Sequence, residues 1–391
     1  MSAHDAAQLL PTSAHVYERT LARAVDTTDV VGPSIDALHG LKILNPPASF
    51  LPYLVWEYGL GMLSPYVPNL YDLIREGVDW QRVRGTPAAV DMALGWVGYE
   101  AAIEYAPVRR RWWNCCQLGL DRVRDDEADL IRIDGLTWLS IPLRSDFWRA
   151  YAGYDVRALE YSEGRWSEAM WSDDSGVVID GARAKWSFGR RVDIVHDITA
   201  EDLAALGIPD PWALEVDGEP LTLDGEPLRF VPTEADLTWG DLTWGDFSWA
   251  GEATQAVSAS LLAATGAGPA WAAFKDAAGE VLFYRRARVR RAVVAATGGV
   301  YAVGASRFSP ATGLATDLYI EAMTDFGEGF GSVAASVGFV LSAHPAAGCK
   351  PGLAHLEPGE LEPAGPIIAE VPVTIEFGRT VRERVACLLR F

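Results

Sequence analysis

Only a few residues in this sequence have the types and spacing that metal chemistry needs. His344, Cys349 and His355 follow one another as H-x4-C-x5-H and resemble a set of metal ligands. The cluster lacks a second paired motif such as C-x-x-C, and it lies in a segment rich in Pro and Gly. We therefore predict no metal site and no cofactor.

Two acidic runs could supply paired carboxylates for glycoside hydrolysis: Asp125-Asp126-Glu127 and Asp173-Asp174. With 53 acidic residues in the chain, however, such runs arise by chance and are usually solvated turns. No H-E-x-x-H, G-x-S-x-G or phosphate-loop pattern is present, and "GEGFG" at 327–331 is interpreted as a glycine-rich turn. We predict that the protein is not an enzyme, and a wall-degrading role stays as an alternative.

A five-residue unit occurs three times between 236 and 250 and places Trp239, Trp244 and Trp249 five positions apart. This step turns successive indoles in different directions on a helix and alternates their face on a strand. Each unit begins with Asp, and ends with Gly or Ala, which is turn chemistry. We predict a compact connector whose indoles pack on neighbouring surfaces. Stacking of exposed indoles on sugar rings is the alternative.

The charge balance argues against nucleic acid as a partner. The chain has 33 Lys and Arg against 53 Asp and Glu, a formal net charge of −20. Such a chain is poorly suited to binding phosphate backbones. The basic runs at 109–111 and 285–291 are predicted to pair with the acidic excess, within the chain or across an interface.

Composition also indicates the compartment. Four cysteines in 391 residues do not form a disulfide framework and fit a reducing environment. No charged-then-apolar signal occurs at the N-terminus, so we expect no export by the usual route. The longest nearly uncharged stretch, 256–274, contains Gly266, Gly268 and Pro269, and we expect a soluble protein with no membrane partner.

The pattern of apolar residues predicts a multidomain α+β protein. We expect a small bundle of about four helices over 1–106, a mixed α/β domain over 107–235, the Trp-repeat connector over 236–252 and a mainly β domain over 253–391.

Several local elements follow from the same pattern. Pro52 is expected to start one helix, and Thr86 should cap another that begins at Pro87. Apolar helical stripes are formed by Tyr17, Leu21, Ala24 and Val25, by Leu70, Leu73, Ile74 and Val78, and by Val90, Ala93, Leu94 and Val97. A short helix capped by Thr199 and another near 253–265 are also predicted. Strands are expected at 281–285, 287–295, 300–303, 317–322, 333–341 and 371–377, with a long exposed or partner-bound loop at 344–366.

Three motifs in the first hundred residues resemble the phage tail protein I family. The first is a Leu-Leu-Pro opening followed by a Glu-Arg pair: Leu9, Leu10, Pro11, Glu18 and Arg19. The second is a Pro before a Leu-Pro-x-Leu-x-Trp segment: Pro47, Leu51, Pro52, Leu54 and Trp56. The third is a basic-Gly-Thr step before a helix: Arg84, Gly85, Thr86, Ala88, Ala89 and Val90. The resemblance covers about 9–98, and the family often has Lys where this chain has Arg84.

The resemblance implies a structural subunit of the baseplate wedge in a contractile phage tail. Such a subunit joins two copies of a baseplate J-type protein, and its C-terminal part reaches toward other baseplate and tail-fibre proteins. It would be assembled in the host cytoplasm and end in the tail baseplate of the virion. A fibre adaptor outside the wedge is an alternative. The candidate interface and connector residues are Trp56, Arg84, Gly85, Thr86, Trp239, Trp244 and Trp249.

Overall fold

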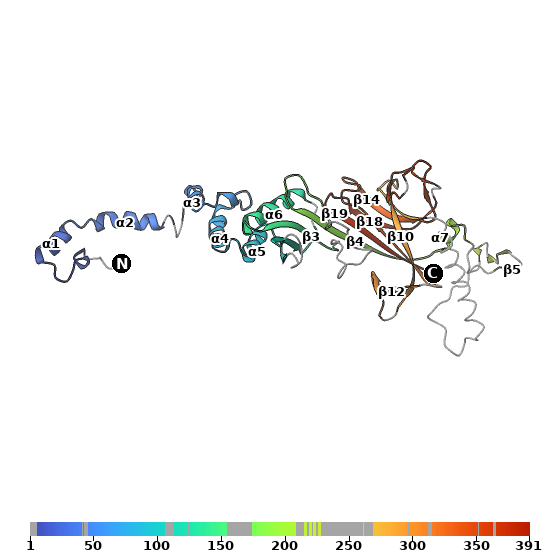
Figure 1. The fold of residues 1–391 in the computed structure, drawn as a ribbon, viewed down its shortest axis with the longest axis horizontal. Coiled ribbons are helices and arrows are strands. Elements are labelled where there is room, and N and C mark those ends of the chain that lie inside the picture. Colours follow the sequence, from blue (N-terminus) through green and yellow to red (C-terminus); the bar gives the residue numbers. More distant parts are fainter. Residues whose placement is uncertain are drawn as a thin grey trace. The chain divides into compact units, whose positions relative to one another are not determined.

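The computed structural model divides into two compact units (Figure 1). Unit 1 consists of 1–99 and 135–144, and unit 2 of 100–134 and 145–391. The structure describes residues 6–40, 42, 46–105, 113–123, 126–154, 174–208, 215–216, 219–220, 222–223, 226–227, 261, 269–295, 298–311, 315–350, 352–362 and 365–391.

Unit 1 is helical. Its elements are η1 (Ala6–Leu9), α1 (Val16–Ala24), α2 (Thr28–His39), α3 (Leu51–Glu57), η3 (Gly61–Leu63), α4 (Leu70–Val83), α5 (Pro87–Trp96) and the second half of α6 (Glu127–Ser140). The predicted helix start is confirmed, since Thr86 is the N-cap of α5 and Pro87 its first residue. Pro52 lies in the first turn of α3, also as predicted.

The core of unit 1 is smaller than the predicted bundle. It is built from α3, η3, α4, α5 and Leu136 of α6, with the fully buried Trp80 among its largest side chains. No residue of α1 is buried, and every described side chain of α2 is exposed or half-buried. The stripe that begins at Tyr17 therefore belongs to a helix outside this core.

Unit 2 contains a large mixed sheet whose main path has the order β1-β2-β3-β4-β19-β13-β10-β9-β14-β18. These strands are β1 (Ala101–Tyr105), β2 (Cys115–Leu120), β3 (Asp146–Ala152), β4 (Lys185–Asp197), β9 (Ala270–Lys275), β10 (Val281–Val294), β13 (Asp317–Met323), β14 (Val333–Val340), β18 (Ile367–Glu376) and β19 (Val381–Arg390). Three pairs are parallel: β2 with β3, β3 with β4, and β4 with β19. The other pairs along this path are antiparallel.

Strands from the predicted middle and C-terminal domains share this sheet. β4 pairs with β19 in register from Phe188 opposite Val381 to Asp197 opposite Arg390, and the two lie side by side in Figure 1. The predicted boundaries at 235 and 252 fall outside the described residues. The region 107–235 also holds α7 (Ala200–Ala205), which Thr199 caps as predicted, and the hairpins β5 (Glu215–Val216) with β6 (Glu219–Pro220) and β7 (Thr222–Leu223) with β8 (Glu226–Pro227).

The strands expected between 281 and 377 form, whereas β9, β12 (Ser306–Pro310) and β19 were not predicted. The predicted strands 281–285 and 287–295 are one continuous strand, β10, and residues 101–105 form a strand where the sequence predicted helix. The remaining short strands are β11 (Tyr301–Val303), β15 (His344–Pro345), β16 (His355–Leu356) and β17 (Leu361–Glu362).

The described residues of the predicted loop at 344–366 are mostly exposed or half-buried, as expected, but two of them pack on the sheet. β16 pairs with β10, and Leu356 and Leu361 are buried against Trp271 and Tyr284 of the sheet. Apolar residues spaced through a Pro- and Gly-rich segment thus cover part of the sheet. The architecture as a whole is multidomain α+β, with helices toward the N-terminus and a mainly β C-terminal region. The predicted helix near 253–265 lies almost wholly outside the described residues.

Candidate protein interface

Two helices of unit 1 expose apolar side chains along their length. We call this set the α1–α2 apolar surface, and it consists of Tyr17, Leu21, Val25, Val31, Ile35 and Leu38. Residues in each helix recur three or four positions apart, so they lie on one helix face. Tyr17 is 69% and Ile35 60% exposed, values that belong to a surface rather than a core. Exposed apolar faces of this kind are typical of surfaces that contact another protein, a membrane or a ligand.

Local chemistry fixes where α1 begins. The His15 ring nitrogen Nδ1 accepts a hydrogen bond from the Tyr17 backbone at 3.2 Å. The Glu18 carboxylate accepts one from the His15 backbone at 2.7 Å. These bonds satisfy donors that a helix start leaves unpaired. Helix α1 can therefore begin without help from the core of unit 1.

Helices α1 and α2 are too short to be stable without packing against another surface. α1 has 9 residues and α2 has 12, and helices shorter than about 12–15 residues are marginal in water unless they pack on something. Pro33 inside α2 removes one further helical hydrogen bond. Neither helix contributes a buried residue to the unit 1 core. A partner that covers the α1–α2 apolar surface would therefore stabilise both helices.

The Arg84-Gly85-Thr86 step forms the corner between α4 and α5. Arg84 donates from Nε to the carbonyl of Leu139 at 2.8 Å, and its guanidinium lies 5.3 Å from the Trp80 ring centre. Gly85 has φ +86° and donates its N–H to the carbonyl of Ser140 at 2.9 Å. This step, a candidate interface from the sequence, binds the end of α6 within unit 1.

Thr86 caps α5 through backbone geometry rather than through its side chain. Its hydroxyl donates to the carbonyl of Val83 at 2.6 Å and makes no capping bond to α5. The extended backbone of Thr86 and the fixed φ of Pro87 set the start of the helix.

Of the four tryptophans predicted to form an interface or connector, the structure describes only Trp56. Trp56 of α3 is 86% exposed, which suits a contact with a partner. Trp239, Trp244 and Trp249 lie outside the described residues, so the connector remains a prediction.

The structure does not assemble the candidate metal ligands. His355 hydrogen-bonds to Glu328 at 2.5 Å and to Glu357 at 3.2 Å, while the Cys349 sulfur lies 4.0 Å from the carbonyl of Glu360. Within the described residues, no group of three His, Cys, Asp or Glu side chains could hold a metal ion.

The described residues of the two acidic runs make contacts within the fold. Asp126 accepts a hydrogen bond from the Ala128 backbone at the start of α6, and Glu127 lies 3.6 Å from Arg379. Asp174 is buried and accepts from the Trp148 indole at 3.3 Å. Asp125 and Asp173 lie outside the described residues.

The helices with the exposed apolar face fall inside a known family. The sequence matches the family model described as Phage tail protein (Tail_P2_I) over residues 10–121. Residues 10–121 therefore match the phage tail protein I family, as the sequence motifs predicted. The match indicates a phage tail protein. Comparison with curated proteins finds no match for the chain.

The phage tail protein I match takes in α1 to α5 and the strands β1 and β2, and it ends before α6. Sequence reasoning found the stripe on α1 but did not identify α2. The signal was present as Val31, Ile35 and Leu38, at spacings of four and three, but Gly32 and Pro33 interrupt it. No helix in the described part of this tail protein is long and apolar enough to cross a membrane.

Proposed function

We propose that this tail protein is a structural subunit of the baseplate wedge in a contractile tail. In this proposal the α1–α2 apolar surface binds a baseplate J-type protein, two copies of which join one copy of this chain. Other baseplate and tail-fibre proteins would contact the C-terminal region, and no catalytic step is required.

The observation that carries the proposal is the position of the apolar surface. It lies inside the stretch that matches the tail family, on helices that contribute nothing to the core of unit 1. Burying a large apolar side chain gains roughly 1.5–3 kcal/mol, so the three such side chains on each helix could support a stable joint. The partner is proposed as protein because the surface is apolar and helical, which is typical of helix-in-groove recognition.

The proposal assigns a mechanical role. A wedge must hold the baseplate closed and then let it open, which is a rigid-body change carried by subunit interfaces. Unit 1 would be the joint within the wedge, and the C-terminal region would connect to the periphery. Sugar binding and wall degradation rest on the Trp repeats and the acidic runs, and no described contact favours either function.

Co-expression with the J-type protein from the same tail gene cluster tests the proposal. Size-exclusion chromatography with light scattering should give a complex of one copy of this chain with two of the J-type protein. If the chain elutes alone at micromolar concentration, the wedge assignment is wrong. A fibre adaptor would instead bind a tail-fibre protein and not the J-type protein.

A further inference from the structure

A row of three arginines stands on one face of β10 in unit 2. Arg286, Arg288 and Arg290 alternate along this strand, and alternate residues of a strand share a face. In the sheet, Arg286 lies opposite Trp271 of β9, and Arg288 lies opposite Glu321 of β13. We call these three residues the β10 arginine row.

The row stands between two small apolar clusters that lie at the two ends of β10. At one end, Tyr284 packs with Leu356 from the 344–366 segment. At the other end, Ala292 packs with Val303 and Phe308 from β11 and β12. Arg286 and Arg288, between these clusters, are exposed, and Arg290 is half-buried. The face is thus covered at both ends of the row and open to solvent along it.

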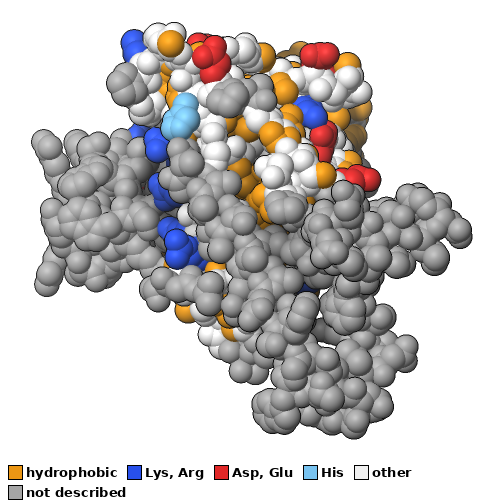
Figure 2. Space-filling view, turned by 90° about the vertical axis from the view of Figure 1, so that its right-hand side faces the viewer, with side chains coloured by type: hydrophobic (Ala, Val, Ile, Leu, Met, Phe, Trp, Pro, Cys, Tyr) orange, Lys and Arg blue, Asp and Glu red, His pale blue; other side chains and the backbone are white. Residues whose placement is uncertain are grey.

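The guanidinium groups of the row have no acidic partner among the described residues. The sequence predicted that the run 285–291 would pair with acidic residues, and Arg285 does so, with Glu328 at 3.0 Å and Asp325 at 3.1 Å. Within the described part of the chain, no ion pair joins Arg286, Arg288 or Arg290 to a carboxylate. Figure 2 shows that Lys and Arg side chains gather in a column on the face of the molecule that it presents.

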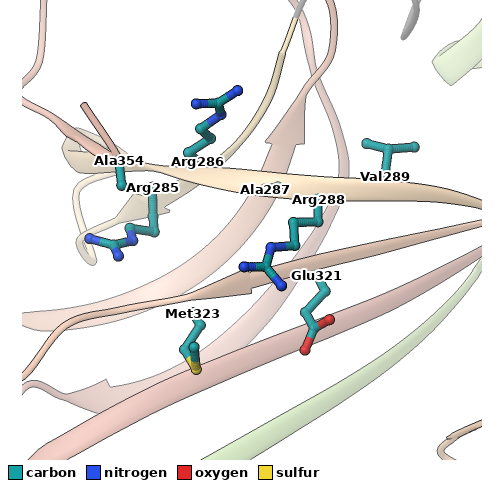
Figure 3. A pocket seen from close by; sticks show the side chains of 8 residues that line it. All are labelled: Arg285, Arg286, Ala287, Arg288, Val289, Glu321, Met323 and Ala354. Atoms are coloured by element: carbon teal, nitrogen blue, oxygen red, sulfur yellow. The ribbon is translucent and has the colours of Figure 1, made fainter. Parts of the chain in front are cut away.

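A pocket of about 510 Å³ lies beside the row. The side chains of Arg286 and Arg288 leave β10 in different directions, and Arg288 extends toward Glu321 on β13 (Figure 3). The Glu321 carboxylate is already bound by Arg384 of β19, so its charge is compensated. The pocket therefore presents an excess of positive charge in a chain whose net charge is −20.

We propose that the β10 arginine row binds an extended acidic segment of a partner protein. The Cα atoms of successive arginines stand about 6.6–6.8 Å apart, twice the rise of a strand. An extended peptide with acidic residues at alternate positions repeats its Cα atoms at the same spacing, so one acidic residue falls beside each arginine of the row. Arginine binds carboxylates through two parallel hydrogen bonds, which favours such a match. This surface is independent of α1 and α2, and its failure would leave the wedge proposal intact.

The surroundings favour peptide over nucleic acid. Single-stranded nucleic acids are held by aromatic side chains that stack on bases, and no aromatic side chain is among the described residues that line the pocket. A formal charge of −20 repels a phosphate backbone at long range, whereas a short acidic segment carries fewer charges into that field.

Fluorescence anisotropy with three labelled peptides tests the proposal on the full chain. The probes are a ten-residue peptide of alternating Glu and Thr, a block peptide of five Glu and five Thr, and an alternating peptide of Gln and Thr. We expect the alternating Glu peptide to bind about ten-fold more tightly than the block peptide, because only its carboxylates match the row. The Gln peptide should not bind.

Charge-matched variants locate the binding. Replacing Arg286, Arg288 and Arg290 with Gln should weaken binding of the alternating peptide about ten-fold or more. The control replaces the exposed Arg75, Arg82 and Arg307 with Gln, and it should leave the affinity unchanged. If the row variant loses its fold by circular dichroism, Arg288→Gln alone should still weaken binding.

Three results would overturn the proposal. Equal loss in the control variant would mean that only total charge matters. Equal binding of the block peptide would remove the spacing argument. Tighter binding of oligothymidylate or dextran sulfate than of the alternating peptide would assign the row to another class of polyanion.

Discussion

The indole Nε1 of Trp80 donates a hydrogen bond to the hydroxyl of Ser140 at 3.0 Å, and both side chains are fully buried. Trp80 belongs to α4, and Ser140 is the last residue of α6, 60 positions later. The Ser140 hydroxyl in turn donates to the carbonyl of Leu136 at 2.7 Å. Together with the backbone bond from Gly85 to Ser140, this contact fixes the corner between α4 and α5 on the end of α6.

Replacing Ser140 with Ala should destabilise unit 1. The Trp80 indole would keep its buried N–H but lose its acceptor, which costs about 1–3 kcal/mol. Urea unfolding followed by tryptophan fluorescence measures the change. Ser64→Ala is the control, because Ser64 is exposed and should have little effect. A loss equal to that of the control would mean that the bond adds nothing to stability.

Gly85→Ala should also destabilise unit 1. Gly85 has φ +86°, a conformation that costs an L-residue about 1–2 kcal/mol. An added Cβ would lie 4.0 Å from Pro142, so backbone strain rather than a clash causes the loss.

Gly95→Ala is a control that should change stability in the opposite direction. Gly95 lies inside α5, with open space around an added Cβ. Ala at this position should stabilise the helix by about 0.5–1 kcal/mol. If thermal unfolding shows the two variants changing in the same direction, the proposed role of the Gly85 backbone is wrong.

The contact between His355 and Glu328 should make unit 2 sensitive to pH. The hydrogen bond to Glu328 is the largest influence and raises the pKa of His355 above its usual value, with a further contribution from Glu357 and an opposing one from burial. The stabilisation is fully present below pH 6.5, the ordinary pKa of a histidine, and is lost as the pH rises through the raised pKa. The advantage of the wild type over His355→Gln in unfolding midpoint should therefore be largest below pH 6.5 and shrink as the pH rises through the raised pKa.

Titration of the His355 ring protons by NMR checks the cause. In the Glu328→Gln variant, the pKa of His355 should fall back toward its ordinary value. An unchanged pKa in that variant would show that Glu328 is not responsible.

A charge placed on the α1–α2 apolar surface should weaken binding to the J-type protein without unfolding the chain. Ile35→Glu introduces a charge where the proposed interface is apolar, and a buried unpaired charge would largely abolish the complex. Ala37→Glu adds the same charge on another side of α2 and should leave the complex intact. Co-purification of both variants with the J-type protein compares them. Equal recovery would remove α2 from the interface.

The sequence predicted best what depends on nearby residues. Thr86 with Pro87, and Thr199 with α7, are start signals contained in a few positions, and both helices begin there. The stripe of Val90, Ala93 and Leu94 likewise identified a buried helix face.

The features that could not be predicted depend on contacts between residues far apart in the sequence. The pairing of β4 with β19 joins residues about two hundred positions apart, and nothing local in either strand specifies it. Whether Arg285 or Arg286 would find a carboxylate depended on where Glu328 lies in the fold. The exposure of Tyr17 and Ile35 could not be predicted, because an amphipathic stripe has the same pattern whether it covers its own core or a partner.

Amide hydrogen exchange of the free chain and of its mixture with the J-type protein tests the central claim most directly. We predict fast exchange throughout α1 and α2 in the free chain, since neither helix packs in a core, and strong slowing there on complex formation. The core helices α4 and α5 should exchange slowly in both states. A complex that slows exchange elsewhere and leaves α1 and α2 unchanged would contradict the account.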